Sequence, residues 1–194
     1  MIWPEAGSER ADRGFVLGIA GSPRKGGNST ILLEAVLDIL ADEFRAEQVC
    51  LADLDIQPCD GCHRCEESGL CRLEDDMPDL CGNLLKADAI ILASPAYMGG
   101  LASRMHAFME RTWPLRKTGM AGKLGSYIVV GRRRPGMATG IMEGYFTRMQ
   151  MITLPGVLGC AFERGGIGRD EESFIQTQQL ADQFRRQLRL RGRR

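Results

Sequence analysis

Four of the chain's seven cysteines lie within thirteen residues, in the stretch CDGCHRCEESGLC from Cys59 to Cys71. Thiols at this density can bind a metal, catalyse a reaction or form disulfides. The N-terminal residues do not combine a basic start with an apolar run, and no apolar stretch is long enough to span a membrane, so we expect a cytoplasmic protein. In a reducing compartment, clustered cysteines are more often metal ligands or catalytic thiols than disulfides.

The spacing of these cysteines favours an iron-sulfur cluster. Four thiolates are the number that one [4Fe-4S] cluster requires, and they are supplied by Cys59, Cys62, Cys65 and Cys71. Structural zinc also binds four cysteines, but zinc sites usually separate two pairs by a long segment. Here the first three cysteines follow one another without such a gap. The cluster is therefore the preferred interpretation, while zinc and a metal-free loop stay open.

A second polar group, GSPRKGGNST from Gly21 to Thr30, follows directly on the apolar run FVLGIA. Its glycines allow backbone amides to turn inward, and donor side chains are supplied by Ser22, Arg24, Asn28, Ser29 and Thr30. Such donors at the start of a helix form an anion site, so we expect a phosphate here. Gly27 stands where a triphosphate-binding loop has its lysine, and the G-x-G-x-x-G spacing of dinucleotide folds is absent.

Apolar runs alternate with amphipathic segments, which predicts an α/β protein with a doubly wound parallel sheet. We expect strands at residues 15–20, 46–52, 89–94, 124–131 and 156–162, and helices at residues 29–44, 77–86, 103–113, 138–151 and 171–191. The chain has 194 residues, of which 44% are hydrophobic, and this suits one domain at residues 15–194 after a polar arm at residues 1–14.

The segment at residues 53–76 is too long for an ordinary connection between a strand and a helix, so we expect it to be functional. It follows the second strand, as the Gly21–Thr30 loop follows the first. Ligands of such sheets bind at the carboxyl ends of the strands. We therefore expect both loops to leave the same edge of the sheet, where the cysteines could lie close to the ligand of the Gly21–Thr30 loop, either in the same subunit or across a dimer interface.

Several motifs together resemble the NADPH-dependent FMN reductase superfamily of flavodoxin-like proteins, and more closely its iron-sulfur flavoprotein branch. They are GSPRKGGNST after the first strand, C-x2-C-x2-C-x5-C after the second, SPAYMGG after the third, and GGIGRDEE. The resemblance extends over about residues 15–175. It implies a five-stranded parallel sheet in the order 2-1-3-4-5 with helices on both faces. It also implies FMN, with its phosphate in the Gly21–Thr30 loop and its isoalloxazine ring beside Pro95, Ala96, Tyr97, Met98 and Gly99.

The loop GRRRPG after the fourth strand departs from the family pattern, because relatives tend to have small residues around the pyrimidine edge of the flavin. We expect Gly131 and Arg132 at the cofactor. If they face the ring, Arg132, Arg133 and Arg134 would stabilise an anionic reduced flavin or hold an acidic donor. A solvated turn is the alternative.

The remaining signals are weaker. A formal net charge of zero and a pI of about 6.7 argue against a nucleic-acid partner. Cys50, Cys81 and Cys160 are expected in the core, and His63 is expected in solvent. The basic C-terminal segment RRQLRLRGRR is expected to be a solvated helix end, with docking of a partner as the alternative.

These features predict an FMN-dependent oxidoreductase with one [4Fe-4S] cluster. It would pass electrons between a reduced donor, such as a ferredoxin or NAD(P)H, and a small-molecule or protein acceptor. The resemblance suggests a homodimer or homotetramer. Two alternatives stay open: an NAD(P)H-dependent FMN or quinone reductase whose cysteine loop is a zinc site or a lid, and a non-catalytic redox carrier or sensor.

Overall fold

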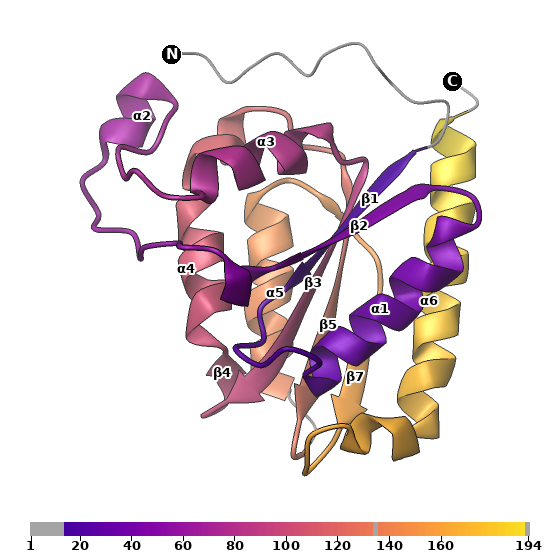
Figure 1. The fold of residues 1–194 in the computed structure, drawn as a ribbon. Coiled ribbons are helices and arrows are strands. Elements are labelled where there is room, and N and C mark those ends of the chain that lie inside the picture. The colour runs from indigo at the N-terminus through magenta and orange to yellow at the C-terminus, as the bar shows by residue number, and fades with distance from the viewer. Residues whose placement is uncertain (1–13, 134–135, 193–194) are drawn as a thin grey trace.

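The sheet has the predicted strand order, with helices on both of its faces (Figure 1). The computed structural model describes residues 14–133 and 136–192, so the predicted arm, apart from Gly14, and Arg134 lie outside the described residues. The strands are β1 (Phe15–Ala20), β2 (Arg45–Cys50), β3 (Ala89–Tyr97), β4 (Gly100–Leu101), β5 (Leu124–Gly131), β6 (Ile152–Thr153) and β7 (Val157–Cys160). The order β2-β1-β3-β5-β6, with β7 also paired to β5, confirms the flavodoxin-like arrangement.

The described sheet has seven strands rather than five, for two reasons. The predicted fifth strand, residues 156–162, corresponds to β7, and the short strand β6 precedes it outside the predicted bounds. β6 pairs with the start of β5 and β7 pairs with its end. Between them lies Gly156, where a Cβ atom would stand only 2.3 Å from the ring of Tyr127, so the chain passes close over that ring. The other addition is β4, which pairs antiparallel with the end of β3.

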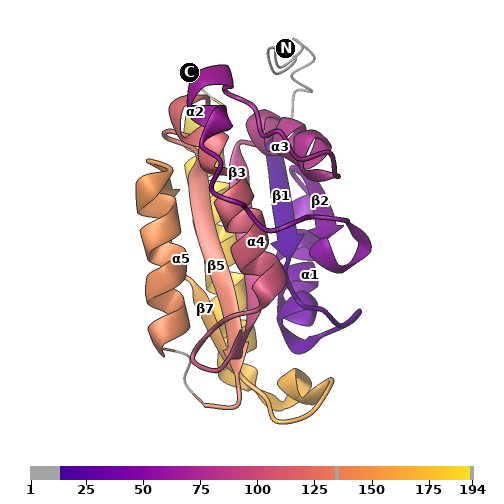
Figure 2. The same cartoon turned by 90° about the vertical axis from the view of Figure 1, so that its left-hand side faces the viewer.

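Two layers of helices cover the sheet (Figure 1; Figure 2). The helices are α1 (Asn28–Ala41), α2 (Arg64–Ser68), α3 (Met77–Lys86), α4 (Ser103–Arg111), α5 (Gly136–Arg148) and α6 (Glu171–Arg191). One core cluster lies between the sheet and α1 and α6, and the other lies between the sheet and α3, α4 and α5. Side chains alternate between the clusters along β1, where Leu17 faces one layer and Val16 the other.

The second strand differs from its prediction. We expected a buried strand, but β2 is an edge strand whose residues are exposed or half-buried. Of the cysteines expected in the core, Cys81 is buried, and desolvation raises the pKa of its thiol to about 12. Cys50 is half-buried and Cys160 is exposed, so the expectation was wrong for both. No helix in the described ranges has the length and hydropathy needed to cross a membrane.

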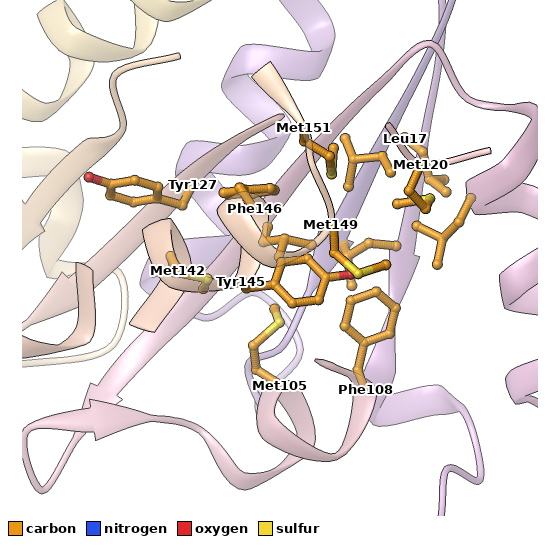
Figure 3. Packing of buried hydrophobic residues seen from close by; sticks show 14 of the residues in the cluster. Leu17, Met105, Phe108, Met120, Tyr127, Met142, Tyr145, Phe146, Met149 and Met151 are labelled. Carbon is orange, nitrogen blue, oxygen red and sulfur yellow. The ribbon is translucent and has the colours of Figure 1, made fainter. Parts of the chain in front are cut away.

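Methionines fill the layer that fixes α4 (Figure 3). Met105 on α4, Met142 on α5 and Met149 lie around the ring of Tyr145, and flexible thioethers suit such irregular spaces. The Tyr145 hydroxyl also forms a 3.0 Å hydrogen bond with Thr112, the residue that follows α4. This packing holds both ends of α4 in place, and each end contacts a segment with candidate chemistry.

Candidate functional site

A cavity of about 160 Å³ opens at the carboxyl ends of the central strands. It is lined by four loops, and the lining residues are Ser22, Arg24, Gly27, Asn28, Ser29, Pro95, Ala96, Tyr97, Val130, Gly131, Arg132, Ala161, Phe162, Glu163 and Arg164. This is the edge at which ligands of doubly wound sheets bind. The structure thus brings together most of the residues that the sequence predicted for the cofactor, and three of the four loops were predicted.

The loop after β1 is shaped around Ser22. Its hydroxyl oxygen accepts a hydrogen bond from the backbone N–H of Arg24 at 3.2 Å, and the N–H of Gly27 donates to the carbonyl of Arg24 at 3.1 Å. A Cβ atom on Gly27 would stand 2.5 Å from the Ser22 oxygen, so only glycine fits there. The turn brings the backbone of the loop round to the start of α1.

The start of α1 has polar groups without partners. The helix begins at Asn28 with no side-chain cap, and its first N–H groups point toward the cavity end of the helix. The hydroxyl of Ser29 is buried and has no hydrogen-bond partner among the described residues. A buried polar group left unpaired costs about 1–3 kcal/mol, so this arrangement suits an anionic ligand that accepts hydrogen bonds.

The loop after β3 forms a tight hairpin. Pro95, Ala96 and Tyr97 line the cavity, and β4 folds back onto β3. The two residues at the turn, Met98 and Gly99, both have positive φ, as two-residue hairpins with a type I′ turn require. Met98 is exposed, and neither Met98 nor Gly99 lines the cavity. Thr30 is buried in α1 and does not line it either. Their predicted contacts to the flavin stay predictions.

The fourth loop, after β7, was missed by the sequence reasoning. Phe162, Glu163 and Arg164 line the cavity. The Asn28 side-chain amide donates to the carbonyl of Glu163 at 2.8 Å, and Arg164 donates to the carbonyl of Lys25 at 2.8 Å. These bonds join the loop after β7 to the phosphate loop. The available signal was position, because these residues directly follow the predicted fifth strand.

The residues of the arginine-rich loop after β5 differ in whether they line the cavity. Gly131 and Arg132 line it, as predicted, whereas Arg133 is exposed and does not. A larger groove of about 550 Å³ lies elsewhere, between α1 and the C-terminal part of α6. Its Arg185 and Arg189 pair with Glu43, so its charges offset one another. We therefore assign the cofactor to the smaller cavity, where the polar groups lack partners.

The four predicted cluster ligands lie on one loop. Cys59 and Cys62 are exposed, and Cys65 and Cys71 are half-buried. Desolvation raises the pKa of the Cys65 thiol, and negative charge on Cys71, Cys59 and Cys62 would raise it further. The set of four soft sulfur donors fits an iron-sulfur cluster. The described residues nevertheless contain no group of three or more Cys, His, Asp or Glu already arranged to hold a metal ion.

The cysteine loop does not stay at the cavity edge. Near the start of α4, Arg104 donates to the carbonyl of Leu51 at 3.1 Å, and at the end of α4, Arg111 donates to the carbonyl of Gln57 at 2.8 Å. The loop therefore runs back along α4, and both views show α2 at the end of the molecule opposite to β4 (Figure 1; Figure 2). Both loops leave the same edge of the sheet, as expected, because β1 and β2 are parallel. Contacts with α4 then direct the cysteine loop away from that edge.

Comparison with known proteins gives the family. The model of the NADPH-dependent FMN reductase family matches residues 15–163. The chain belongs to this family. It is 40% identical over 123 residues to an iron-sulfur flavoprotein of Methanocaldococcus jannaschii, and this alignment covers 62% of this chain and 64% of the relative. It is 33% identical over 159 residues to an iron-sulfur flavoprotein of Archaeoglobus fulgidus, and this alignment covers 80% of this chain and 72% of the relative.

These relatives support the iron-sulfur flavoprotein branch of the FMN reductase family. The matched part spans slightly less than two thirds of the Methanocaldococcus relative. A solved FMN-dependent NADH-azoreductase of Bacillus anthracis, in complex with FMN, superposes with a TM-score of 0.68 at 12% identity, covering 88% of this chain and 99% of the other. That likeness supports the flavodoxin-like fold alone.

Proposed function

We propose that this member of the FMN reductase family is an FMN-dependent oxidoreductase that carries one [4Fe-4S] cluster on Cys59, Cys62, Cys65 and Cys71. It passes electrons between a reduced donor, a ferredoxin-like protein or NAD(P)H, and a small-molecule or protein acceptor. FMN supplies the exchange between two-electron and one-electron partners.

The observation that carries the proposal is the buried, unpaired hydroxyl of Ser29 at the uncapped start of α1, inside a cavity lined by Arg24. A phosphate group there would accept hydrogen bonds from Ser29 and from the first backbone amides of the helix, and Arg24 would offset its charge. The backbone of Pro95, Ala96 and Tyr97 then forms the wall for the ring system.

We also propose that the working form is a homodimer or homotetramer. The cavity is smaller than the ~300–1,000 Å³ usual for small-molecule sites, and two aromatic residues on its rim are open, with Tyr97 42% and Phe162 76% exposed. In addition, the cysteine loop of one chain lies at the far end of α4 from the cavity. Exchange of electrons between cysteine loop and flavin would therefore take place between two chains, and light scattering on the purified protein tests the assembly.

The decisive experiment is an absorption spectrum of protein purified without oxygen, combined with iron, sulfide and flavin analysis. FMN together with iron and sulfide supports the proposal. Bound zinc without sulfide would instead support a plain NAD(P)H-dependent FMN or quinone reductase. Steady-state turnover with NAD(P)H, or with reduced ferredoxin, then separates an oxidoreductase from a non-catalytic carrier.

Arg132 is expected to raise the reduction potential of the bound flavin, because a nearby positive charge stabilises the anionic reduced form. Arg132→Gln should lower the two-electron reduction potential by roughly 20 mV, since an exposed unit charge contributes about 1 kcal/mol to such an interaction. Arg133→Gln is the matched control, because Arg133 does not line the cavity. Redox titration measures both, and an unchanged potential in Arg132→Gln would leave the solvated turn as the better interpretation.

A further inference from the structure

The base of the cysteine loop is closed by hydrogen bonds between residues before and after the four cysteines. The N–H of Asp55 donates to the Asp76 carboxylate at 2.7 Å, and the N–H of Asp76 donates to the carbonyl of Asp55 at 3.0 Å. The N–H of Gln57 donates to the Asp75 carboxylate at 3.0 Å. Gln57 comes shortly before Cys59, and Asp75 comes shortly after Cys71. These bonds therefore hold together the segment that enters the cysteine loop and the segment that leaves it.

One buried arginine of another element supports this base. Arg111, the last residue of α4, has a fully buried side chain, as does its partner Asp75. The guanidinium donates to both oxygens of the Asp75 carboxylate, at 2.5 and 3.0 Å. The nitrogen atom that makes the shorter bond also donates to the carbonyl of Gln57 at 2.8 Å. Arg111 thus binds both ends of the loop at once, with a fork that lysine cannot reproduce.

The same guanidinium has one further buried donor. The Arg111 Nε atom is buried and has no acceptor among the described residues. A buried donor without a partner is costly, so stability alone does not account for an arginine at this position.

We propose that Arg111 is a positioning residue for the cysteine loop: it holds Gln57 and Asp75 together at the base of the loop that carries the four cysteines. This inference rests on the proposed cluster for its purpose, but the closure of the loop by Arg111 can be measured without the cluster. Burying an ion pair is a poor way to gain stability alone, since apolar residues often serve as well. A role in fixing the ligand loop accounts for a charged pair at this position.

The test compares Arg111→Lys with Arg104→Lys. Arg104 lies on the same helix and also bonds a backbone carbonyl of this connection, that of Leu51, but it does not touch the base of the loop. With the cluster present, Arg111→Lys should release iron to a chelator about tenfold faster than wild type, the factor expected from losing one hydrogen bond to a charged group. In cluster-free protein, limited proteolysis within residues 53–76 should speed up by a similar factor. FMN content should not change.

Arg104→Lys should behave as wild type in both measurements. The inference is overturned if Arg111→Lys matches wild type in iron release and proteolysis. It is also overturned if the variant loses FMN together with iron, because Arg111 would then support the whole fold rather than the cysteine loop. Wild-type protein without iron and sulfide would sink the proposed function instead, and the proteolysis of the cluster-free variants would still decide the role of Arg111.

Discussion

Cys62→Ala is expected to remove iron and sulfide from the protein while FMN stays bound. In the proposed [4Fe-4S] cluster each of the four thiolates would hold one iron, so the variant would leave one iron without its protein ligand and the cluster would be lost or become labile. FMN should remain at about one per chain, because its proposed contacts lie on other loops. The measurement is the iron, sulfide and FMN stoichiometry of both proteins under anaerobic conditions.

The control for this variant is Cys160→Ala. Cys160 is also an exposed thiol, but it lies at the end of β7, outside the cysteine loop, so its replacement should leave iron and sulfide unchanged. Rapid mixing adds a functional readout: Cys62→Ala should lose one-electron exchange with a ferredoxin-like partner, while any direct reduction of the flavin by NAD(P)H persists. Loss of FMN together with iron in Cys62→Ala would show that the two sites are structurally coupled, contrary to their separation along α4.

Arg24→Ala is expected to weaken FMN binding by about one to two decades, since a hydrogen bond between charged groups contributes ~1.5–3 kcal/mol. Arg24 lines the cavity next to the start of α1, and its exposed side chain is the charged group of the predicted phosphate loop. The backbone N–H of Arg24 bonds Ser22, and alanine keeps that bond, so the loop should hold its shape. Titration of FMN into flavin-free protein measures the dissociation constant.

Lys25→Ala supplies the matched control, because it removes the same charge from the next residue. The Lys25 ammonium pairs with Asp53 at 2.7 Å, and its side chain does not line the cavity. Ser29→Ala should weaken FMN binding as well and should not destabilise the flavin-free protein, because the hydroxyl has no partner to lose among the described residues. Equal FMN affinity in wild type, Arg24→Ala and Ser29→Ala would show that this loop does not bind the phosphate of FMN.

Local sequence determined the elements and the chemistry of the loops. The predicted bounds of β1, β5, α3 and α6 agree with the structure, because hydrophobic periodicity and helix-breaking residues act within a few positions of the chain. The polar residues after β1 and β3 were placed at the cavity because the carboxyl ends of neighbouring parallel strands meet at one edge. The spacing of the cysteines is likewise a local property, and it was enough to suggest a four-thiol site.

Tertiary structure decided what local sequence does not encode. The loop after β7 reaches the phosphate loop through bonds between Asn28 and Glu163, which lie 135 positions apart. The direction of the cysteine loop depends on Arg104 and Arg111, whose bonding partners lie 36 to 54 positions away. Such contacts form only when distant elements pack together, so no periodicity or spacing records them. The sequence therefore indicated which residues are candidates to bind a flavin and a cluster, and only the packing of α4 showed that the cysteine loop runs away from the cavity.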